Sequence, residues 1–373
     1  MGEGVLLALL LATSAGAEAW YSGAAMPLTS YSSDTGLGFG ARAFAQRLGD
    51  GEERPIKLEA QAFGTTYGQQ FHFVSLDVPH AFGTRMRLEV LGGYRKDIAA
   101  PYYGIGNDTS PSQSVAESQY VYREEAPMAR LRMRWPIAGA LSVLAGYRFL
   151  DQHVQAAAGS LLAEQSPFGS RGGRYGELSA GLAFDTRDDE LAPVRGVLLE
   201  LTGRATHPAF GSEAASAGVF AAVSVYTEIA PRLVLAGRFA FDATTGEVPF
   251  DRLQDFGSLT TPFYVVSGVG GALTVRGLLQ SEYVGPVKVI GNLELRYKAI
   301  DTTVLGHRVG LAGVAFVDEG RVFVPGQPVA AGGIHTGVGS GLRFFLGDSV
   351  LLRADAAFAE GRTRIYADFG YNF

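Results

Sequence analysis

The stretch "VKVIGNLELRY", residues 287–297, separates apolar from polar side chains along an extended chain. One face would carry Val287, Val289, Leu293, Leu295 and Tyr297, and the other Lys288, Asn292, Glu294 and Arg296. Because successive side chains of a strand point to opposite faces, this period of two predicts a β-strand. The run is longer than the usual strand of about 5–6 residues. It matches the roughly 9–11 residues that a tilted strand needs to cross a bilayer.

The same alternation recurs at residues 85–95, 232–242 and 363–373. A soluble sandwich and a membrane barrel both alternate, the first with apolar residues inward and the second with apolar residues toward lipid. Strand length favours the barrel, and so do the aromatic residues near the ends of the runs, namely Tyr94, Tyr147, Tyr297 and Tyr371. Since a bilayer excludes open sheet edges, such strands must close into a cylinder.

The number of strands follows from the runs and from loop parity. Alternating runs are predicted near 36–47, 55–66, 69–79, 84–95, 119–134, 141–150, 175–185, 195–206, 215–229, 232–242, 287–299, 308–318, 335–345, 349–358 and 363–373. Single-chain bacterial barrels have even strand counts, with long loops outside the cell. Because neighbouring strands run in opposite directions, the long connectors 96–118, 151–174, 243–286 and 319–334 would all lie on the same side of the membrane. The fifteen runs give an odd number, and an additional strand within 20–33 makes the number even. We therefore predict an all-β fold, a single 16-stranded antiparallel transmembrane β-barrel.

Composition restricts the class of protein. The chain has 373 residues, no cysteine, a net charge of −6 and only 18% charged residues. The absence of a basic block argues against nucleic acid as a partner. Residues 5–12 form an apolar core and Ala17-Glu18-Ala19 fits a cleavage site, although the preceding Met-Gly-Glu-Gly lacks a basic residue. We predict a signal peptide at 1–19 and a barrel domain at 20–373, exported to the outer membrane of a Gram-negative cell.

Patterns that would indicate an enzyme are weak. The six histidines, His72, His80, His153, His207, His307 and His335, show no metal-ligand spacing, and no G-x-S-x-G elbow occurs. Asp185, Arg187, Asp188 and Asp189 could form a calcium site, but a solvated turn with local capping is the favoured interpretation. We predict no catalytic residue, no metal and no cofactor.

Loop 243–286 contains one arginine among small and apolar residues, in Val275-Arg276-Gly277-Leu278. This stretch resembles the VRGF/Y motif of the outer-membrane assembly superfamily, the BamA/TamA-type and bacterial surface antigen barrels. Phe316-Val317-Asp318 resembles the partner motif in strand thirteen, and Glu294 matches a lumen-facing acid in strand twelve. Phe373 resembles the C-terminal signal that the assembly machinery reads. The resemblance covers nearly the whole chain after residue 19.

The chain departs from the family pattern twice. Leu278 replaces the usual aromatic residue, so we expect the loop tip to pack less tightly. No space for a periplasmic POTRA domain precedes the first strand, so we expect a member without POTRA domains. A periplasmic or lipoprotein partner would then have to replace them. The other expected partners are outer-membrane lipid, lipopolysaccharide and the barrel assembly machinery that would insert the chain.

The resemblance implies a role in the insertion or translocation of proteins, or of another client, at the outer membrane. Arg276 is a planar fork of five donors that remains charged. A bidentate pair with Asp318 or Glu294 would hold the loop in the lumen.

Two other functions stay open. One is a passive, mildly anion-favouring pore, lined by Arg85, Arg87, Arg95, Arg148, Arg232, Arg238, Arg296, Arg343 and Arg364. The other, less favoured, is an outer-membrane enzyme.

Overall fold

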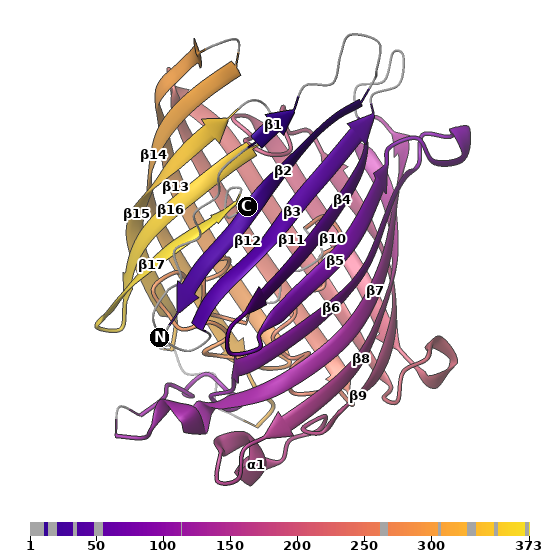
Figure 1. The fold of residues 1–373 in the computed structure, drawn as a ribbon, viewed down its shortest axis with the longest axis vertical. Helices are drawn as coiled ribbons and strands as arrows, with labels where there is room; N and C mark the ends of the chain where they lie inside the picture. The colour runs from indigo at the N-terminus through magenta and orange to yellow at the C-terminus, as the bar shows by residue number, and fades with distance from the viewer. Residues whose placement is uncertain are drawn as a thin grey trace. The chain divides into compact units, whose positions relative to one another are not determined.

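The computed structural model describes residues 11–13, 21–32, 36–47, 55–112, 114–261, 268–304, 307–326, 333–346, 350–369 and 373. The fold is all-β. The strands are β1 (Leu11–Thr13), β2 (Tyr21–Ser32), β3 (Gly36–Arg47), β4 (Ile56–Thr65), β5 (Gln70–Val78), β6 (Arg87–Pro101), β7 (Val121–Ala138), β8 (Leu141–Ala156), β9 (Gly172–Asp185), β10 (Gly196–Thr206), β11 (Ser216–Ala230), β12 (Leu233–Gly246), β13 (Val287–Val304), β14 (His307–Phe323), β15 (His335–Leu346), β16 (Val350–Ala359) and β17 (Arg362–Phe369). They belong to one sheet, in which chain neighbours pair as hairpins (Figure 1).

The first of two compact units comprises Met1–Ala100, Ala116–Gly181 and Arg204–Ser216. It contains β1 to β8 and most of β9. Its short helices are η1 (Ala81–Gly83), η2 (Glu117–Tyr120), α1 (Leu161–Gln165) and η3 (Pro208–Phe210), all in connections between strands. Helix α1 begins at Ser160, whose hydroxyl accepts a hydrogen bond from the backbone N–H of Ala163, and it ends at the left-handed Ser166.

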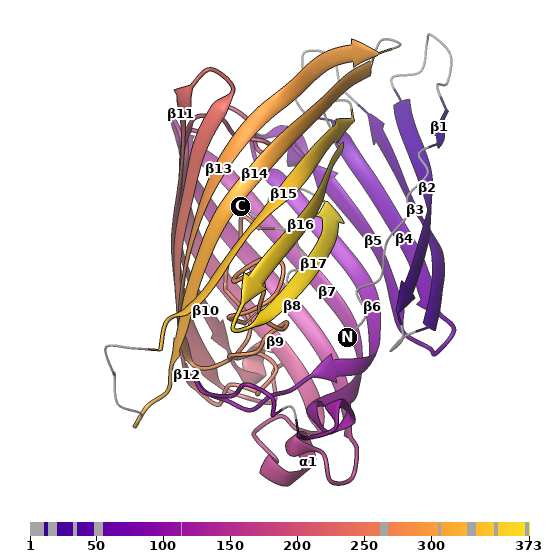
Figure 2. The same cartoon turned by 90° about the vertical axis from the view of Figure 1, so that its left-hand side faces the viewer.

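The second unit comprises Pro101–Val115, Leu182–Gly203 and Ala217–Phe373. It contains most of β10 and β11, and all of β12 to β17. Figure 2 shows β13 to β17 side by side as antiparallel hairpins. The register places Asn292 of β13 opposite Asp318 of β14, and Asp318 opposite Gly337 of β15. The same unit contains loop 247–286, which connects β12 to β13.

Burial alternates along these strands, and the buried face is the polar one. On β13 the side chains of Lys288, Asn292, Glu294 and Arg296 are buried, whereas Leu293, Leu295 and Tyr297 are 40–51% exposed. A soluble sheet would bury its apolar face. The inverted pattern is that of strands whose apolar face meets lipid. In the described part of the chain, no helix has both the length and the apolar character needed to span a membrane.

The predicted strands are confirmed, including the additional one, which is β2 (Tyr21–Ser32). All four predicted long loops were too long, because β6, β8, β12 and β14 continue beyond the alternating runs to Pro101, Ala156, Gly246 and Phe323. The predicted loop 243–286 is therefore loop 247–286. The last strand ends at Phe369, and residues 370–372 lie outside the described residues. Of the predicted signal peptide, only β1 is described, and it pairs with β2.

Candidate functional site

The tip of loop 247–286, residues 273–279, is held in shape by the loop itself. Val269 pairs with Tyr283 through two backbone hydrogen bonds. The hydroxyl of Thr274 donates to the carbonyl of Gly268 at 2.8 Å and accepts from the N–H of Gly270 at 3.0 Å. These bonds hold together the two sides of the segment that contains Arg276.

Gly277 permits the close approach of the tip to β16. Its φ is 98°, in the left-handed region that glycine adopts without steric cost. A Cβ built at this position would lie 2.8 Å from the Cβ and the backbone nitrogen of Ala359. A side chain here would therefore be excluded both by backbone conformation and by space.

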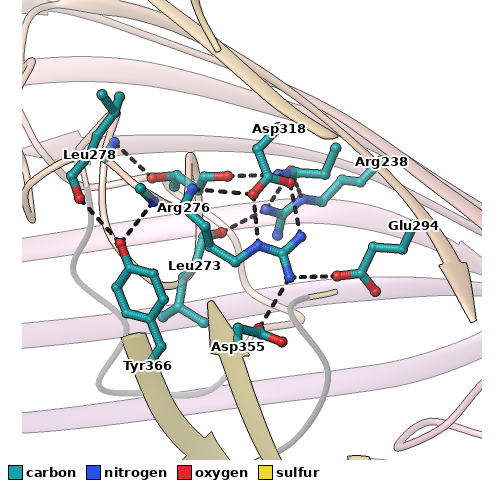
Figure 3. Close-up of polar contacts among 12 residues, drawn as sticks. Arg238, Leu273, Arg276, Leu278, Glu294, Asp318, Asp355 and Tyr366 are labelled. Carbon is teal, nitrogen blue, oxygen red and sulfur yellow. Dashed lines mark hydrogen bonds and ion pairs between the residues drawn. The ribbon is translucent and has the colours of Figure 1, made fainter. Parts of the chain in front are cut away.

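Asp318 of β14 is the main partner of Arg276. The Nε of Arg276 donates to Oδ2 of Asp318 at 2.7 Å, and NH2 donates to Oδ1 at 2.9 Å. The backbone N–H of Arg276 donates to the same carboxylate at 3.1 Å. Both side chains are fully buried. The pair is thus bidentate and desolvated, the geometry in which an arginine–carboxylate interaction is strongest (Figure 3).

Two further carboxylates share the guanidinium. NH1 of Arg276 lies 2.8 Å from Oε1 of Glu294 on β13 and 3.2 Å from Oδ2 of Asp355 on β16. The ring of Phe316 covers the guanidinium, with 3.4 Å between Cζ and the ring centroid. One loop residue is therefore bound to three strands of the unit (Figure 3).

Two further arginines and one amide donate hydrogen bonds to these acids. Arg296 donates to Glu294 at 2.8 Å, and Arg343 donates to Asp355 at 2.5 Å. The amide of Asn292 donates to Asp318 at 2.8 Å and to the backbone carbonyl of Thr274 at 2.6 Å. Burying charges is costly unless each is paired and hydrogen-bonded. Here every carboxylate around Arg276 has a second donor.

Arg238 of β12 connects this network to the tip backbone. Its Nε and NH2 both donate to the side-chain oxygen of Asn292, and NH2 also donates to the carbonyl of Leu273 at 2.7 Å. The tip is therefore bound through its backbone as well as through Arg276.

Tyr366 of β17 binds the backbone of the tip from another strand. Its hydroxyl accepts a hydrogen bond from the N–H of Gly277 at 2.9 Å and donates to the carbonyl of Leu278 at 3.2 Å (Figure 3). One hydroxyl thus satisfies two polar groups of the tip backbone.

Leu278 itself is fully buried in an apolar cluster with Phe220, Val269, Val275, Tyr283, Ile290, Val322, Ala240 and Ala359. Leu278 is therefore part of the apolar core of the loop tip. That it packs less tightly than the aromatic residue of the family stays a prediction.

Replacing Tyr366 with phenylalanine should lower the free energy of unfolding by about 1–3 kcal/mol, because a buried N–H and a buried carbonyl lose their partner. The temperature at which the heat-modifiable folded band disappears on a gel would report the loss. Tyr297→Phe is the matched control, since Tyr297 is half exposed on the lipid-facing side of β13. Equal melting of the two variants would contradict the bond from Tyr366 to the tip.

A second attachment holds the first half of the loop. Glu200 of β10 accepts hydrogen bonds from the hydroxyls of Ser258 and Thr260, at 2.7 Å in the case of Ser258. It also accepts from the backbone N–H of Leu259 at 2.5 Å. This carboxylate is buried and lies on a different strand from every partner of Arg276. The loop is therefore bound at two separate places.

A third contact, next to the Glu200 anchor, involves Asp242, which binds both the loop and β13. Asp242 of β12 accepts from the N–H of Gly257 at 2.9 Å and pairs with Nζ of Lys288 at 3.1 Å. Both side chains of that pair are fully buried.

The structure brings the predicted site residues together. Val275, Arg276, Gly277 and Leu278 lie against Glu294, Phe316 and Asp318. Sequence reasoning missed Asp355, Tyr366, Asn292 and Glu200. A weak signal existed for Glu200, the single acid within the apolar run "VLLELTG" at 197–203.

Phe373 lies against the same network. Its ring is 5.0 Å from the guanidinium carbon of Arg238 and 5.2 Å from that of Arg296. Its backbone oxygen accepts from Arg296 at 3.1 Å. Its role as a C-terminal assembly signal stays a prediction.

Several of the arginines that were expected to line a pore have acidic partners. Arg87 pairs with Asp77 at 2.6 Å and Arg148 with Glu177 at 3.2 Å. Arg95 pairs with Glu124. Arg85 and Arg232 lie outside the strands, in the connections that precede β6 and β12. The excess of positive charge from which anion preference was inferred is therefore smaller than the sequence indicated.

The acidic turn at 186–195 contains local capping bonds. Oδ1 of Asp189 accepts from the N–H groups of Leu191 and Ala192, and Oδ1 of Asp188 accepts from those of Val194 and Arg195. Within the described residues no group of acids and histidines has the arrangement of a metal site. The capping interpretation of this turn is confirmed.

Comparison with known proteins gives a consistent result. A model of the Omp85 superfamily domain matches residues 48–373. No curated protein matches the sequence. Two solved structures are similar over nearly the whole chain. BamA from Haemophilus ducreyi lacking POTRA domains 1–3 has 15% sequence identity and a TM-score of 0.58, and the match includes 98% of this chain and 75% of that one. CdiB from Escherichia coli has 11% sequence identity and a TM-score of 0.62, and the match includes 97% of this chain and 66% of that one. At these identities the likeness shows the fold, the predicted 16-stranded antiparallel β-barrel.

Proposed function

Because the chain belongs to the Omp85 superfamily, we propose that it helps to insert or translocate proteins, or another client, at the outer membrane of a Gram-negative cell. Members of this superfamily are non-enzymatic assembly or transport barrels. The observation that carries the proposal is the buried tip of loop 247–286, where Arg276 is shared by Asp318, Glu294 and Asp355.

In this proposal Arg276 is a lock that holds the loop against the buried side chains of β13, β14 and β16. A passive pore needs no such network, since buried ion pairs are a poor source of stability compared with apolar packing. A network that involves β13, β14, β16 and β17 instead fixes one arrangement of the strands at the C-terminal end of the barrel. We infer that the lock keeps these strands in register while a client is handled.

The proposal includes a location and partners. The chain would be exported by its residues 1–19 and inserted by the barrel assembly machinery, with Phe373 as the signal that this machinery reads. Outer-membrane lipid and lipopolysaccharide would contact the exposed apolar faces, such as Leu293, Leu295 and Tyr297. A periplasmic protein or lipoprotein would deliver the client.

The test is a quantitative outer-membrane proteome of cells with and without this chain. Selective loss of a few surface proteins or barrels is expected, with recovery by the wild-type gene and not by Arg276→Ala at equal abundance in the membrane. Arg174→Ala is the control, because Arg174 forms an exposed ion pair. An unchanged proteome, together with single-channel conductance by the purified barrel, would contradict the proposal and favour the pore.

A further inference from the structure

A second group of polar side chains lies apart from the network around Arg276. It consists of Asn107, Ser110, Glu282, Tyr283, His335 and Glu360, which we call the His335 cluster. These residues come from loop 102–112, loop 247–286, the start of β15 and the turn between β16 and β17. Four separate segments of the second unit therefore meet at one histidine.

Both ring nitrogens of His335 face oxygen atoms that can accept a hydrogen bond. Nδ1 lies 2.6 Å from Oε1 of Glu360, and Nε2 lies 2.9 Å from the backbone carbonyl of Asn107. A carbonyl oxygen can only accept, and so can an ionised carboxylate. A neutral imidazole has a single N–H, so it can satisfy only one of the two contacts. Both are made only by the doubly protonated, positively charged ring.

The carboxylate of Glu360 is ionised, so the second proton belongs to the histidine. Its oxygens accept from the hydroxyl of Tyr283 at 3.1 and 3.0 Å, and Oε2 accepts from Arg362 at 3.1 Å. Burial raises the pKa of Glu360, but the hydrogen bonds from His335 and Tyr283 outweigh it, and the net pKa lies below the ordinary value.

The surroundings of His335 also include an aromatic ring and further charged groups. The ring of Tyr283 stacks on the imidazole at 3.6 Å between centroids and 12° between planes. Glu282 is fully buried beside Arg362, its ion-pair partner at 2.6 Å. The remaining nearby cation, Arg321, lies close to Gly333 of the segment before β15. The groups around His335 therefore include two carboxylates, one phenol and two arginines, namely Glu282, Glu360, Tyr283, Arg362 and Arg321.

Loop 102–112 is bound to the barrel through this cluster. The hydroxyl of Thr109 donates to the carbonyl of Glu282 at 2.8 Å, and Ser110 lies 2.6 Å from the hydroxyl of Tyr283. The side chain of Asn107 donates to the carbonyl of Gly333 at 2.8 Å and accepts from the N–H of Val322 at 2.8 Å. His335 adds the charged contact that joins this loop to the turn at Glu360.

We propose that His335 is a proton-dependent clasp that holds loop 102–112 onto loop 247–286 and the β16–β17 turn. The direction follows from the contacts. The clasp is closed while the ring has two protons and opens when the ring loses one of them, because one of the two contacts is then lost. At the acid end it weakens as pH falls through the lowered pKa of Glu360. The loop is therefore held most firmly in mildly acidic medium.

A spin label on the loop tests the clasp. The chain has no cysteine, so Ser112→Cys, at an exposed position, gives a single labelling site. In the full chain, in lipid, the label is expected to be mostly immobile at pH 6. The ratio of mobile to immobile label should be about tenfold higher at pH 9 than at pH 6, because the loop then loses one hydrogen bond to a charged group.

Three variants make the test specific. His335→Gln and Glu360→Gln should give spectra that do not change between pH 6 and pH 9. His207→Gln should respond like the unmodified chain, because the contacts of His207 are with its own η3 turn. Identical spectra of the labelled parent at both pH values would overturn the proposal, and this result does not depend on the folding of any His335 variant. A full response in His335→Gln would overturn it too.

Discussion

Replacing Arg276 with alanine is expected to lower the free energy of unfolding of the barrel by about 3–5 kcal/mol, the usual cost of removing one partner from a buried ion pair. Asp318, Glu294 and Asp355 would remain buried after losing their shared cation. Urea-induced unfolding in detergent micelles or lipid, followed by tryptophan fluorescence and by gel mobility, would measure the loss.

Two further variants separate charge from geometry. Arg276→Lys keeps the positive charge but cannot form the two parallel bonds to Asp318, so it should lose an intermediate amount. Arg174→Ala breaks the ion pair with Glu213, in which both side chains are more than half exposed, and should have little effect. If Arg276→Ala unfolds at the same urea concentration as Arg174→Ala, the tip is not held by its charge.

Replacing Gly337 with alanine is expected to expel the tip without changing any charge. Gly337 lies on β15 opposite Asp318. A Cβ at this position would lie 1.9 Å from the carbonyl oxygen of Arg276 and 3.4 Å from a methyl group of Val275. Because the obstacle is backbone, no side-chain rotation relieves the overlap, and the tip must withdraw from β15.

Labelling of a single cysteine at position 278 would detect this withdrawal. Leu278 is fully buried, so Leu278→Cys should resist a maleimide in the otherwise unchanged barrel and react readily when Gly337→Ala is added. Gly313→Ala is the control, since a Cβ at Gly313 on β14 meets nothing within 4 Å. Protection of the cysteine in the Gly337→Ala barrel would show that the tip does not lie against β15.

The strands could be predicted from the sequence because the signal is local. A period of two over ten or more residues depends only on chain neighbours, and it identified every long strand from β3 to β17. Strand β2, which contains Gly23 and Pro27, has the weakest alternation. It was predicted only because the barrel needs an even number of strands. Strand ends were less certain, because β6, β8 and β14 continue past the bilayer-facing residues that produce the alternation.

The site was predictable only where a motif existed. The VRG stretch, Glu294 and Asp318 could be paired because the resemblance placed them in particular strands. Asp355 and Tyr366 lie 79 and 88–89 positions from their partners in the tip, and their proximity depends on the register of three hairpins. Nothing in the local sequence distinguishes Asp355 from any other acid on a buried strand face. The packing around Leu278 could not be predicted either, although Leu278 lies in the motif. Its neighbours come from six separate segments, and a motif does not show how these pack together.

The most direct test of the lock is a double-mutant cycle between Arg276 and Asp318, each replaced by alanine singly and together, with unfolding free energies measured in one lipid or micelle system. If the bidentate pair holds the tip, the two losses will not add, and the coupling energy will be about 2–3 kcal/mol, the upper range for residues in direct contact. Additive losses, with a coupling energy within about 0.5 kcal/mol of zero, would contradict the claim that Arg276 holds the loop through Asp318.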